Sequence, residues 1–282
     1  MIAVRDLVRR RPLLCYFALA YLVSAIALAV IGLPRLHDAA GKPSMSLVMF
    51  PVMVISVGLA GVILTALADG RPGLADLRAR FSRRVPRRWL AVLLIPPCAI
   101  LAVLSVLSLG VSSQFTPGFF VYGIAAGILA GFCEELGWTG FAYPRLRARH
   151  GWLPAALLLG VLWGVWHLPV VDSLGAASPH GRYWPEFFAA FVVTLVGLRA
   201  LIAWAYARTG SLRLAQLLHA SSTGFLVVLS APRVTPGEEA FWYFLYAAVL
   251  WIVVITIVSL QRIRHVPVPA PAPAAGQLVP GP

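Results

Sequence analysis

Long apolar runs separated by short charged segments recur along the whole chain. A helix that crosses a bilayer needs about 20 mainly apolar residues, which is close to the length of these runs. Only 12% of the residues are charged, against about 25% in soluble domains. We therefore expect an all-α, polytopic membrane protein. The runs predict eight transmembrane helices, at residues 13–33, 45–68, 89–111, 118–143, 152–171, 187–207, 211–230 and 240–260.

The distribution of basic residues predicts how these helices are oriented. Lysine and arginine are retained on the cytoplasmic side of membrane proteins. If the N-terminus is cytoplasmic, the outer loops hold only four of the 23 basic residues, namely Arg35, Lys42, Arg182 and Arg233. Both termini are therefore predicted to be cytoplasmic. The net charge of +13 does not indicate nucleic-acid binding, because the basic residues lie between apolar runs rather than on one soluble face.

The chain is expected to form one helical unit followed by a tail. Residues 1–265 contain all eight predicted helices, and the polar motifs described below fall within 118–230. Residues 266–282 are rich in proline and alanine, a composition typical of disordered or extended segments. We expect a disordered cytoplasmic tail there.

Two adjacent glutamates, Glu134 and Glu135, interrupt the apolar run at 118–143. A charged side chain at membrane depth costs about 2.5–3.5 kcal/mol on insertion scales, so a chain that keeps two carboxylates there is expected to use them. Two neighbouring buried carboxylates cannot easily both ionise. One is therefore expected to act as a general base, and the other as a protonated or charge-paired support.

Two histidines, His167 and His219, also fall inside predicted helices. The fourth and fifth helices predict an antiparallel hairpin that turns near His150–Gly151, which would place Glu134 and His167 at equal depth. This register requires the fourth helix to continue past Pro144 to about Leu146. Small residues are expected to let the two helices approach closely. They are Gly123, Gly127 and Gly131 on the fourth helix and Gly160 and Gly164 on the fifth, with Gly137 opposite Gly164.

These groups suit three kinds of chemistry. A carboxylate that activates water, with one histidine sharing the proton and another facing a developing oxyanion, could hydrolyse a peptide bond. Alternatively, Glu134, His167 and His219 could be the ligands of a divalent metal such as zinc. A proton or ion relay in a transporter would also use buried ionisable groups. The sequence holds no H-E-x-x-H motif and leaves the choice open.

Three motifs together resemble those of the CAAX protease and bacteriocin-processing (CPBP, or Abi) family of intramembrane proteases. The stretch EELGWTGFAYPRL resembles the E-E-x-x-x-R motif of the family. WGVWH resembles its second motif, an aromatic residue followed four positions later by histidine, and HASST resembles its third, a histidine followed four positions later by asparagine. Their order, their spacing and the eight predicted helices agree with the family.

The resemblance implies a role for each polar residue. It implies that Glu134 is the base that activates water, that Glu135 supports it, that His167 assists the base and that His219 faces the oxyanion. The family is often described as metalloproteases, although a metal-free glutamate mechanism is also proposed for it. The implied substrate is a peptide or a lipidated protein in the membrane. The alternative is a catalytically weakened relative that acts in bacteriocin immunity or as a scaffold, and a transporter is the third possibility.

Two positions depart from the family pattern. Thr139 stands where the family has arginine, and Thr223 stands where it has asparagine. Thr223 lies one helical turn from His219 and can still donate one hydrogen bond near the oxyanion. Arg199 lies inside the apolar run at 187–207, and we hypothesise that it replaces the missing cation by pairing with Glu135. The alternative is that its side chain extends to the cytoplasmic headgroups.

Overall fold

The computed structural model describes residues 2–32 and 42–263 of the chain. Every regular element in these ranges is helical, which confirms the predicted all-α fold. In each long helix the backbone N–H and C=O groups bond to one another within the same segment, as a membrane interior requires. The α-helices are α1 (Ile2–Arg10), α2 (Pro12–Ala27), α4 (Lys42–Ser82), α5 (Ile95–Gly110), α6 (Tyr122–Gly137), α7 (Tyr143–His150), α8 (Trp152–Trp166), α9 (Trp184–Thr209), α10 (Leu212–Val228) and α11 (Pro236–Ile263).

Each of the eight predicted segments contains a helix, and five of the described helices are long and apolar enough to cross a membrane. The protein is thus a multi-pass integral membrane protein. In the other three predicted segments lie α6, α8 and α10, which have 16, 15 and 17 residues. The five candidate spans are Pro12–Ile31, Met49–Ser82, Arg87–Gly110, Gly181–Thr209 and Pro236–Gln261.

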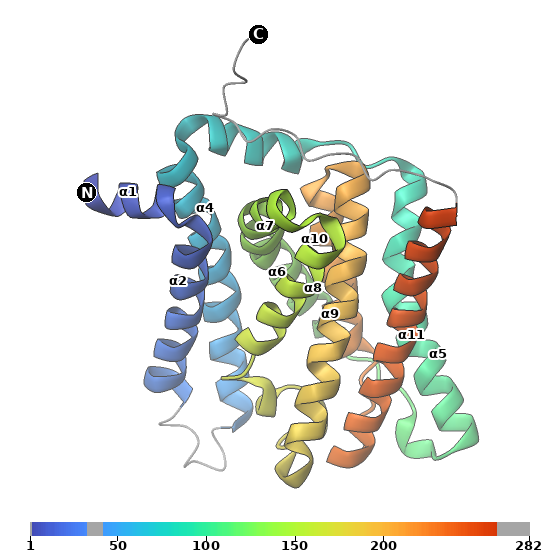
Figure 1. Cartoon of the computed structure of the whole chain (residues 1–282). Helices are drawn as coiled ribbons and strands as arrows, with labels where there is room; N and C mark the ends of the chain where they lie inside the picture. The colour runs from blue at the N-terminus through green and yellow to red at the C-terminus, as the bar shows by residue number, and fades with distance from the viewer. Residues whose placement is uncertain (1, 33–41, 264–282) are drawn as a thin grey trace.

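Helix α4 changes direction at Gly70, whose φ of 67° lies in the left-handed region that glycine adopts without steric cost. The part of α4 before the kink runs along the bundle, and the part after it crosses one end (Figure 1). The first and last described helices, α1 and α11, bring the two ends of the described chain to this same end of the molecule. The predicted tail at 266–282 lies outside the described residues, and the single unit at 1–265 stays a prediction.

The predicted hairpin between the fourth and fifth helices is present. Helix α6 continues through the π-helical turn η4 (Trp138–Ala142) into α7, and the chain reverses at Gly151 before α8. Pro144 directly follows the π-helical turn η4, where the regular i→i−4 hydrogen bonding is already interrupted, so its missing N–H is tolerated. Figure 1 shows α6, α7 and α8 in the middle of the bundle, with α2 and α4 on one side and α9 and α11 on the other.

The predicted contact between the glycine faces of these two helices is wrong. The glycines of α6 face α10, whose Ala220 and Gly224 are themselves small, so the two backbones pack directly. Helix α8 uses its glycines against α9 instead, and α6 and α8 are bridged by tryptophan side chains. The contacts are Gly123 with Gly224, Gly127 with Ala220 and Gly224, Gly131 with Gln216 and Ala220, Gly137 with Tyr16 and Val57, Gly160 with Val196, and Gly164 with Val192.

Candidate active site

Glu135 is buried and holds the densest group of polar contacts in the described bundle. Arg199 on α9 donates to both of its oxygens, from Nη1 to Oε2 at 2.9 Å and from Nη2 to Oε1 at 2.6 Å. His219 Nδ1 lies 2.8 Å from Oε1, and the Thr139 hydroxyl donates to Oε2. A buried carboxylate is tolerated when it is paired and fully hydrogen-bonded. Glu135 therefore ties α6, α9 and α10 together.

The pairing of Arg199 with Glu135 that we hypothesised is present, and the alternative that its side chain extends to the headgroups is wrong. Arg199 is fully buried, and its guanidinium lies 4.5 Å from the centre of the Trp163 ring. Burial is offset by the two-pronged contact with the carboxylate, a geometry that suits arginine. Arg199 Nη1 also donates to the Thr139 hydroxyl at 3.2 Å. Thr139, whose side chain is shorter than the arginine of the family motif, thus contacts the guanidinium of Arg199, which comes from α9.

Glu134 has a different environment, although it is also buried. Its Oε2 accepts hydrogen bonds from the indole Nε1 of Trp138 at 2.9 Å and of Trp163 at 2.7 Å. Within the described ranges its other oxygen, Oε1, has no hydrogen-bond partner. One oxygen is thus fixed by two neutral donors, while the other keeps its lone pairs available.

His219 lies between Glu135 and the Trp163 ring. Its Nδ1 faces the carboxylate, and its ring meets that of Trp163 edge-on with 4.8 Å between the centroids. A carboxylate oxygen can only accept, so Nδ1 carries the proton.

His167 follows the last residue of α8. Its Nδ1 lies 2.9 Å from the backbone oxygen of Trp163, so this nitrogen also carries the proton and Nε2 is the free nitrogen. The ring packs against Trp166 and Phe191, with centroids 4.8 and 5.0 Å away. No hydrogen bond joins His167 to Glu134 in the described structure. The residue of α8 that meets Glu134 is Trp163, one turn before the predicted His167.

Thr223 is half-buried on α10, one turn after His219. Its side chain makes no hydrogen bond with any described residue, and its role toward an oxyanion stays a prediction.

The predicted metal ligands do not form a metal site in the arrangement described here. Across residues 2–32 and 42–263, no three His, Cys, Asp or Glu side chains lie close enough together to hold an ion. Glu134, His167 and His219 therefore do not fit a three-ligand zinc site, which needs convergent donors about 2.0–2.2 Å from the ion.

Trp163 is the functional candidate whose importance was not evident from the sequence, where packing explained it equally well. Its indole donates to Glu134, its ring contacts Arg199 and His219, and its backbone oxygen orients His167. Its position four residues before His167 was the only signal in the sequence. Trp163 thus contacts four of the candidate residues, namely Glu134, Arg199, His219 and His167.

We expect Trp163→Phe to lower kcat of the activity proposed below by about tenfold or more, because a hydrogen bond to a buried carboxylate is worth about 1.5–3 kcal/mol. The phenyl ring can keep the contacts with Arg199 and His219, so folding should be largely preserved. Trp251→Phe is a matched control, since it removes an indole donor that bonds the Val193 backbone oxygen at 3.1 Å, away from this site. Equal kcat values for the two variants would contradict the role of Trp163.

Comparison with known proteins agrees with the three motifs. Residues 116–225 match the family model of the Type II CAAX prenyl endopeptidase Rce1-like proteins. A protein named CAAX prenyl protease 2, from Methanococcus maripaludis, is 36% identical over 87 residues, which are 28% of this chain and 32% of that protein. The match with this relative thus spans about a third of the relative's own length. These matches confirm the family resemblance that the motifs predicted.

Proposed function

We propose that this chain, a member of the CAAX protease and bacteriocin-processing family, is an intramembrane endopeptidase that hydrolyses a peptide bond with water activated by Glu134. The observation that supports this most is the contrast between the two glutamates. Both oxygens of Glu135 are occupied by Arg199, His219 and Thr139, whereas Glu134 keeps Oε1 available. A general base needs a free oxygen within reach of its proton donor.

The chemistry would run through these groups as follows. Glu134 Oε1 takes a proton from water while the water oxygen bonds to the carbonyl carbon of the substrate. His219, which Glu135 holds through Nδ1, would face the developing oxyanion, and Thr223 would donate a hydrogen bond to it. The C–N bond then breaks, and the proton held by Glu134 passes to the leaving nitrogen with the help of His167 Nε2. Glu135, which Arg199 holds in place, would orient the ring of His219.

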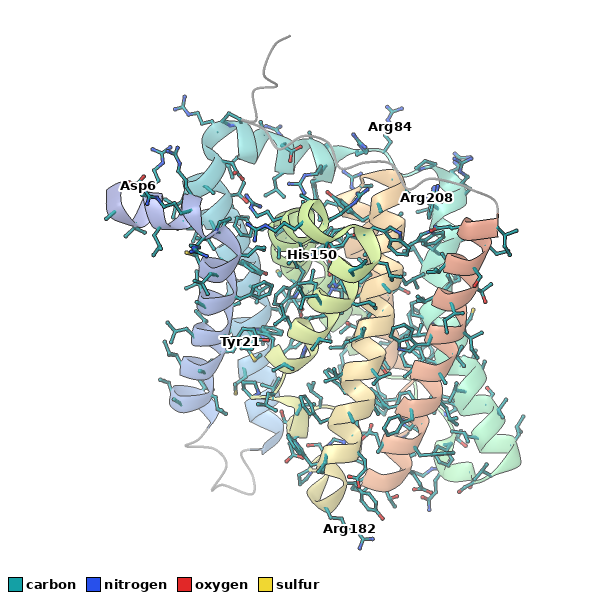
Figure 2. The ribbon with its side chains drawn as sticks, viewed as in Figure 1. Asp6, Tyr21, Arg84, His150, Arg182 and Arg208 are labelled. Carbon is teal, nitrogen blue, oxygen red and sulfur yellow. The ribbon has the colours of Figure 1, made fainter. Side chains whose placement is uncertain are left out.

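We also propose that all eight helices cross the membrane with both termini cytoplasmic. The arginines support this orientation, because Figure 2 shows Arg84 and Arg208 at one end of the molecule and Arg182 at the opposite end. The side of the molecule that carries Arg84 and Arg208 also holds the first and last described residues of the chain. Helices α6, α8 and α10 are short, and each of them packs against a longer helix, α6 against α4 and both α8 and α10 against α9.

The names of the family and of the relative point to a prenylated protein as the substrate. The direct test is to reconstitute the purified protein in liposomes with a prenylated peptide that ends in a CAAX sequence, and to follow cleavage by mass spectrometry. We expect cleavage near the C-terminus, and slower cleavage of the same peptide without the prenyl group. If folded protein cleaved neither peptide, the endopeptidase proposal would be overturned. The departures at Thr139 and Thr223 would then favour the catalytically weakened immunity or scaffold relative.

We expect the activity to persist after treatment with a strong metal chelator, because no three His, Cys, Asp or Glu side chains of the described residues lie close enough together to hold an ion. The measurement is the cleavage rate together with the metal content of the same sample. Loss of activity on chelation, with recovery when zinc is added back, would contradict this prediction and favour the metalloprotease alternative.

A further inference from the structure

A third buried carboxylate lies in the first turn of α11, at the opposite end of the molecule from Arg84 and Arg208. Glu239 is 1% exposed. Its Oε1 accepts the backbone N–H of Ala176, and its Oε2 accepts that of Ala177, both at 2.8 Å. His180 Nε2 lies 3.2 Å from the same Oε2. One carboxylate thus holds three groups of the loop that joins α8 to α9.

The loop is shaped to receive this carboxylate. Gly175 has a φ of 84°, and a Cβ at this position would meet the carboxylate of Glu239. The backbone N–H of His180 donates to Asp172 Oδ1 at 2.9 Å, and His180 Nδ1 lies 3.5 Å from the same oxygen. The imidazole therefore lies between two carboxylates. We call Asp172, His180 and Glu239 the loop latch.

Two routes connect the loop latch to His167. Along the backbone, the N–H groups of Val170 and Val171 both donate to the His167 carbonyl at 2.9 Å, directly before Asp172. Through side chains, the His180 ring stacks on Phe187 with 3.7 Å between centroids and 12° between planes. Phe187 contacts Phe191 at 6.1 Å, and Phe191 packs edge-on against His167 at 5.0 Å.

Helix α11 also packs against the adjacent rings of Phe187 and Phe191, which we call the Phe187–Phe191 column. Tyr243, one turn after Glu239, contacts Phe187 at 4.9 Å and Phe191 at 6.4 Å. The imidazole of His167 itself has only one hydrogen bond, to its own helix. Its orientation therefore depends on the rings around it and on the chain that follows it.

We propose that Glu239 is a positioning residue, which holds the α8–α9 loop through the loop latch and thereby fixes His167 for catalysis. The inference rests on the proposed role of His167 in the endopeptidase. Glu239 contacts none of the candidate active-site residues and acts through the loop and the Phe187–Phe191 column.

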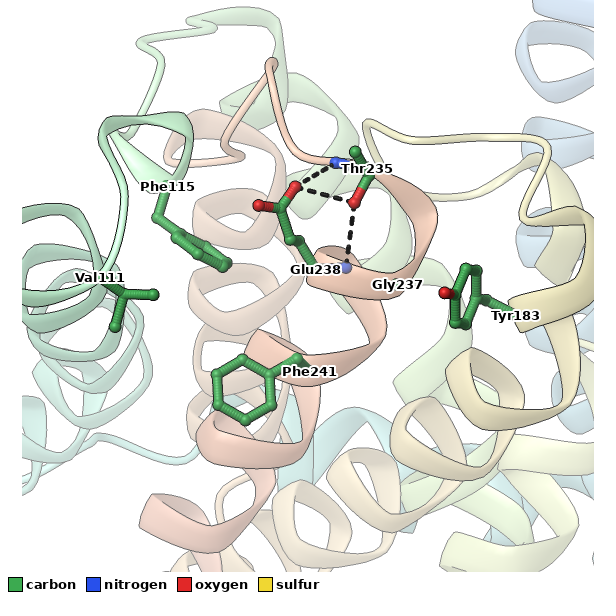
Figure 3. A pocket seen from close by; sticks show the side chains of 7 residues that line it. All are labelled: Val111, Phe115, Tyr183, Thr235, Gly237, Glu238 and Phe241. Atoms are coloured by element: carbon green, nitrogen blue, oxygen red, sulfur yellow. Dashed lines mark hydrogen bonds between the residues drawn. The ribbon is translucent and has the colours of Figure 1, made fainter.

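The test compares Glu239→Gln with Glu238→Gln. Glu238 is the adjacent residue, and its carboxylate accepts the backbone N–H and the hydroxyl of Thr235, both at 2.8 Å, at a surface pocket beside Tyr183 (Figure 3). It is thus a matched change outside the loop latch. The first readout is amide hydrogen exchange of residues 170–177 in the purified protein, and the second is trypsin cleavage after the exposed Arg182. Both are independent of peptidase activity.

We expect Glu239→Gln to raise exchange and cleavage by about tenfold or more, because it removes the charge from a buried hydrogen-bonded group. The increase should include the amides of Val170 and Val171, and kcat should fall with little change in KM. Glu238→Gln should leave all four measurements unchanged. If Glu239→Gln does not fold, the same measurements are made on His180→Phe. A phenyl ring at position 180 keeps the stack on Phe187 but removes the contact between His180 Nε2 and the Glu239 carboxylate.

Two results would overturn the proposal. In the first, exchange and cleavage are the same in Glu239→Gln and Glu238→Gln. In the second, exchange and cleavage of the loop increase, but kcat and the exchange rates of the Val170 and Val171 amides stay at wild-type values. The loop latch would then have no effect on His167. If wild-type protein cleaves no peptide, the endopeptidase proposal fails, while the exchange at Val170 and Val171 still decides whether the latch positions His167.

Discussion

Glu134→Gln is expected to lower kcat by about 10²–10⁴-fold, the usual contribution of a positioned general base. The amide oxygen of glutamine can accept the indole N–H groups of Trp138 and Trp163 in place of Oε2, so the side chain should keep its position. The amide nitrogen then lies where Oε1 was and cannot take a proton from water. Since the substrate contacts are unaffected, KM should change little.

The measurement is steady-state cleavage of the prenylated peptide in liposomes, with thermal unfolding recorded on the same preparations. Glu186→Gln is the control, because Glu186 is an exposed carboxylate in the first turn of α9 and lies outside the site. Its kcat should equal that of the wild type. A Glu134→Gln protein that is folded and retains wild-type kcat would remove Glu134 from the mechanism.

The positions of the helices could be predicted from the sequence because the apolar runs have the length that a bilayer requires. The helix through Pro144 and the reversal at Gly151 followed from the same pattern. Helix partners could not be predicted in this way. A row of glycines on α6 shows that some backbone comes close, but it does not identify that backbone as α10. Only the full packing of the bundle decides between α8 and α10.

The polar residues of the site were predictable as a group, because carboxylates and histidines are costly in an apolar run. Their individual contacts were less so. A tryptophan in an apolar helix is equally consistent with packing and with donating a hydrogen bond, so the link from Trp163 to Glu134 had no separate signal. The loop latch was missed for a similar reason. Glu239 and His180 are far apart in sequence and lie near predicted helix ends, where solvated charges are common.

Arg199→Ala is expected to destabilise the protein by about 3–5 kcal/mol, because removing one partner of a buried ion pair leaves the other charge uncompensated. Glu135 would keep His219 and Thr139 but lose both contacts with the guanidinium. Cleavage activity should fall with stability, since His219 is oriented by the same carboxylate. The measurement is unfolding of the detergent-solubilised protein, with Arg78→Ala as the control for an exposed arginine.

A second substitution makes this prediction specific to the charge. Thr139 is four residues after Glu135 on the continuous helix, at the position of the arginine in the E-E-x-x-x-R motif that this stretch resembles. In the double variant Arg199→Ala, Thr139→Arg, the new guanidinium lies one turn from Glu135 and can use the space that Arg199 filled. We expect it to recover most of the lost stability, whereas Thr139→Arg alone should destabilise, since two buried cations would then share one carboxylate. If Arg199→Ala were as stable as Arg78→Ala, Arg199 would not be the functional replacement for the arginine missing at position 139.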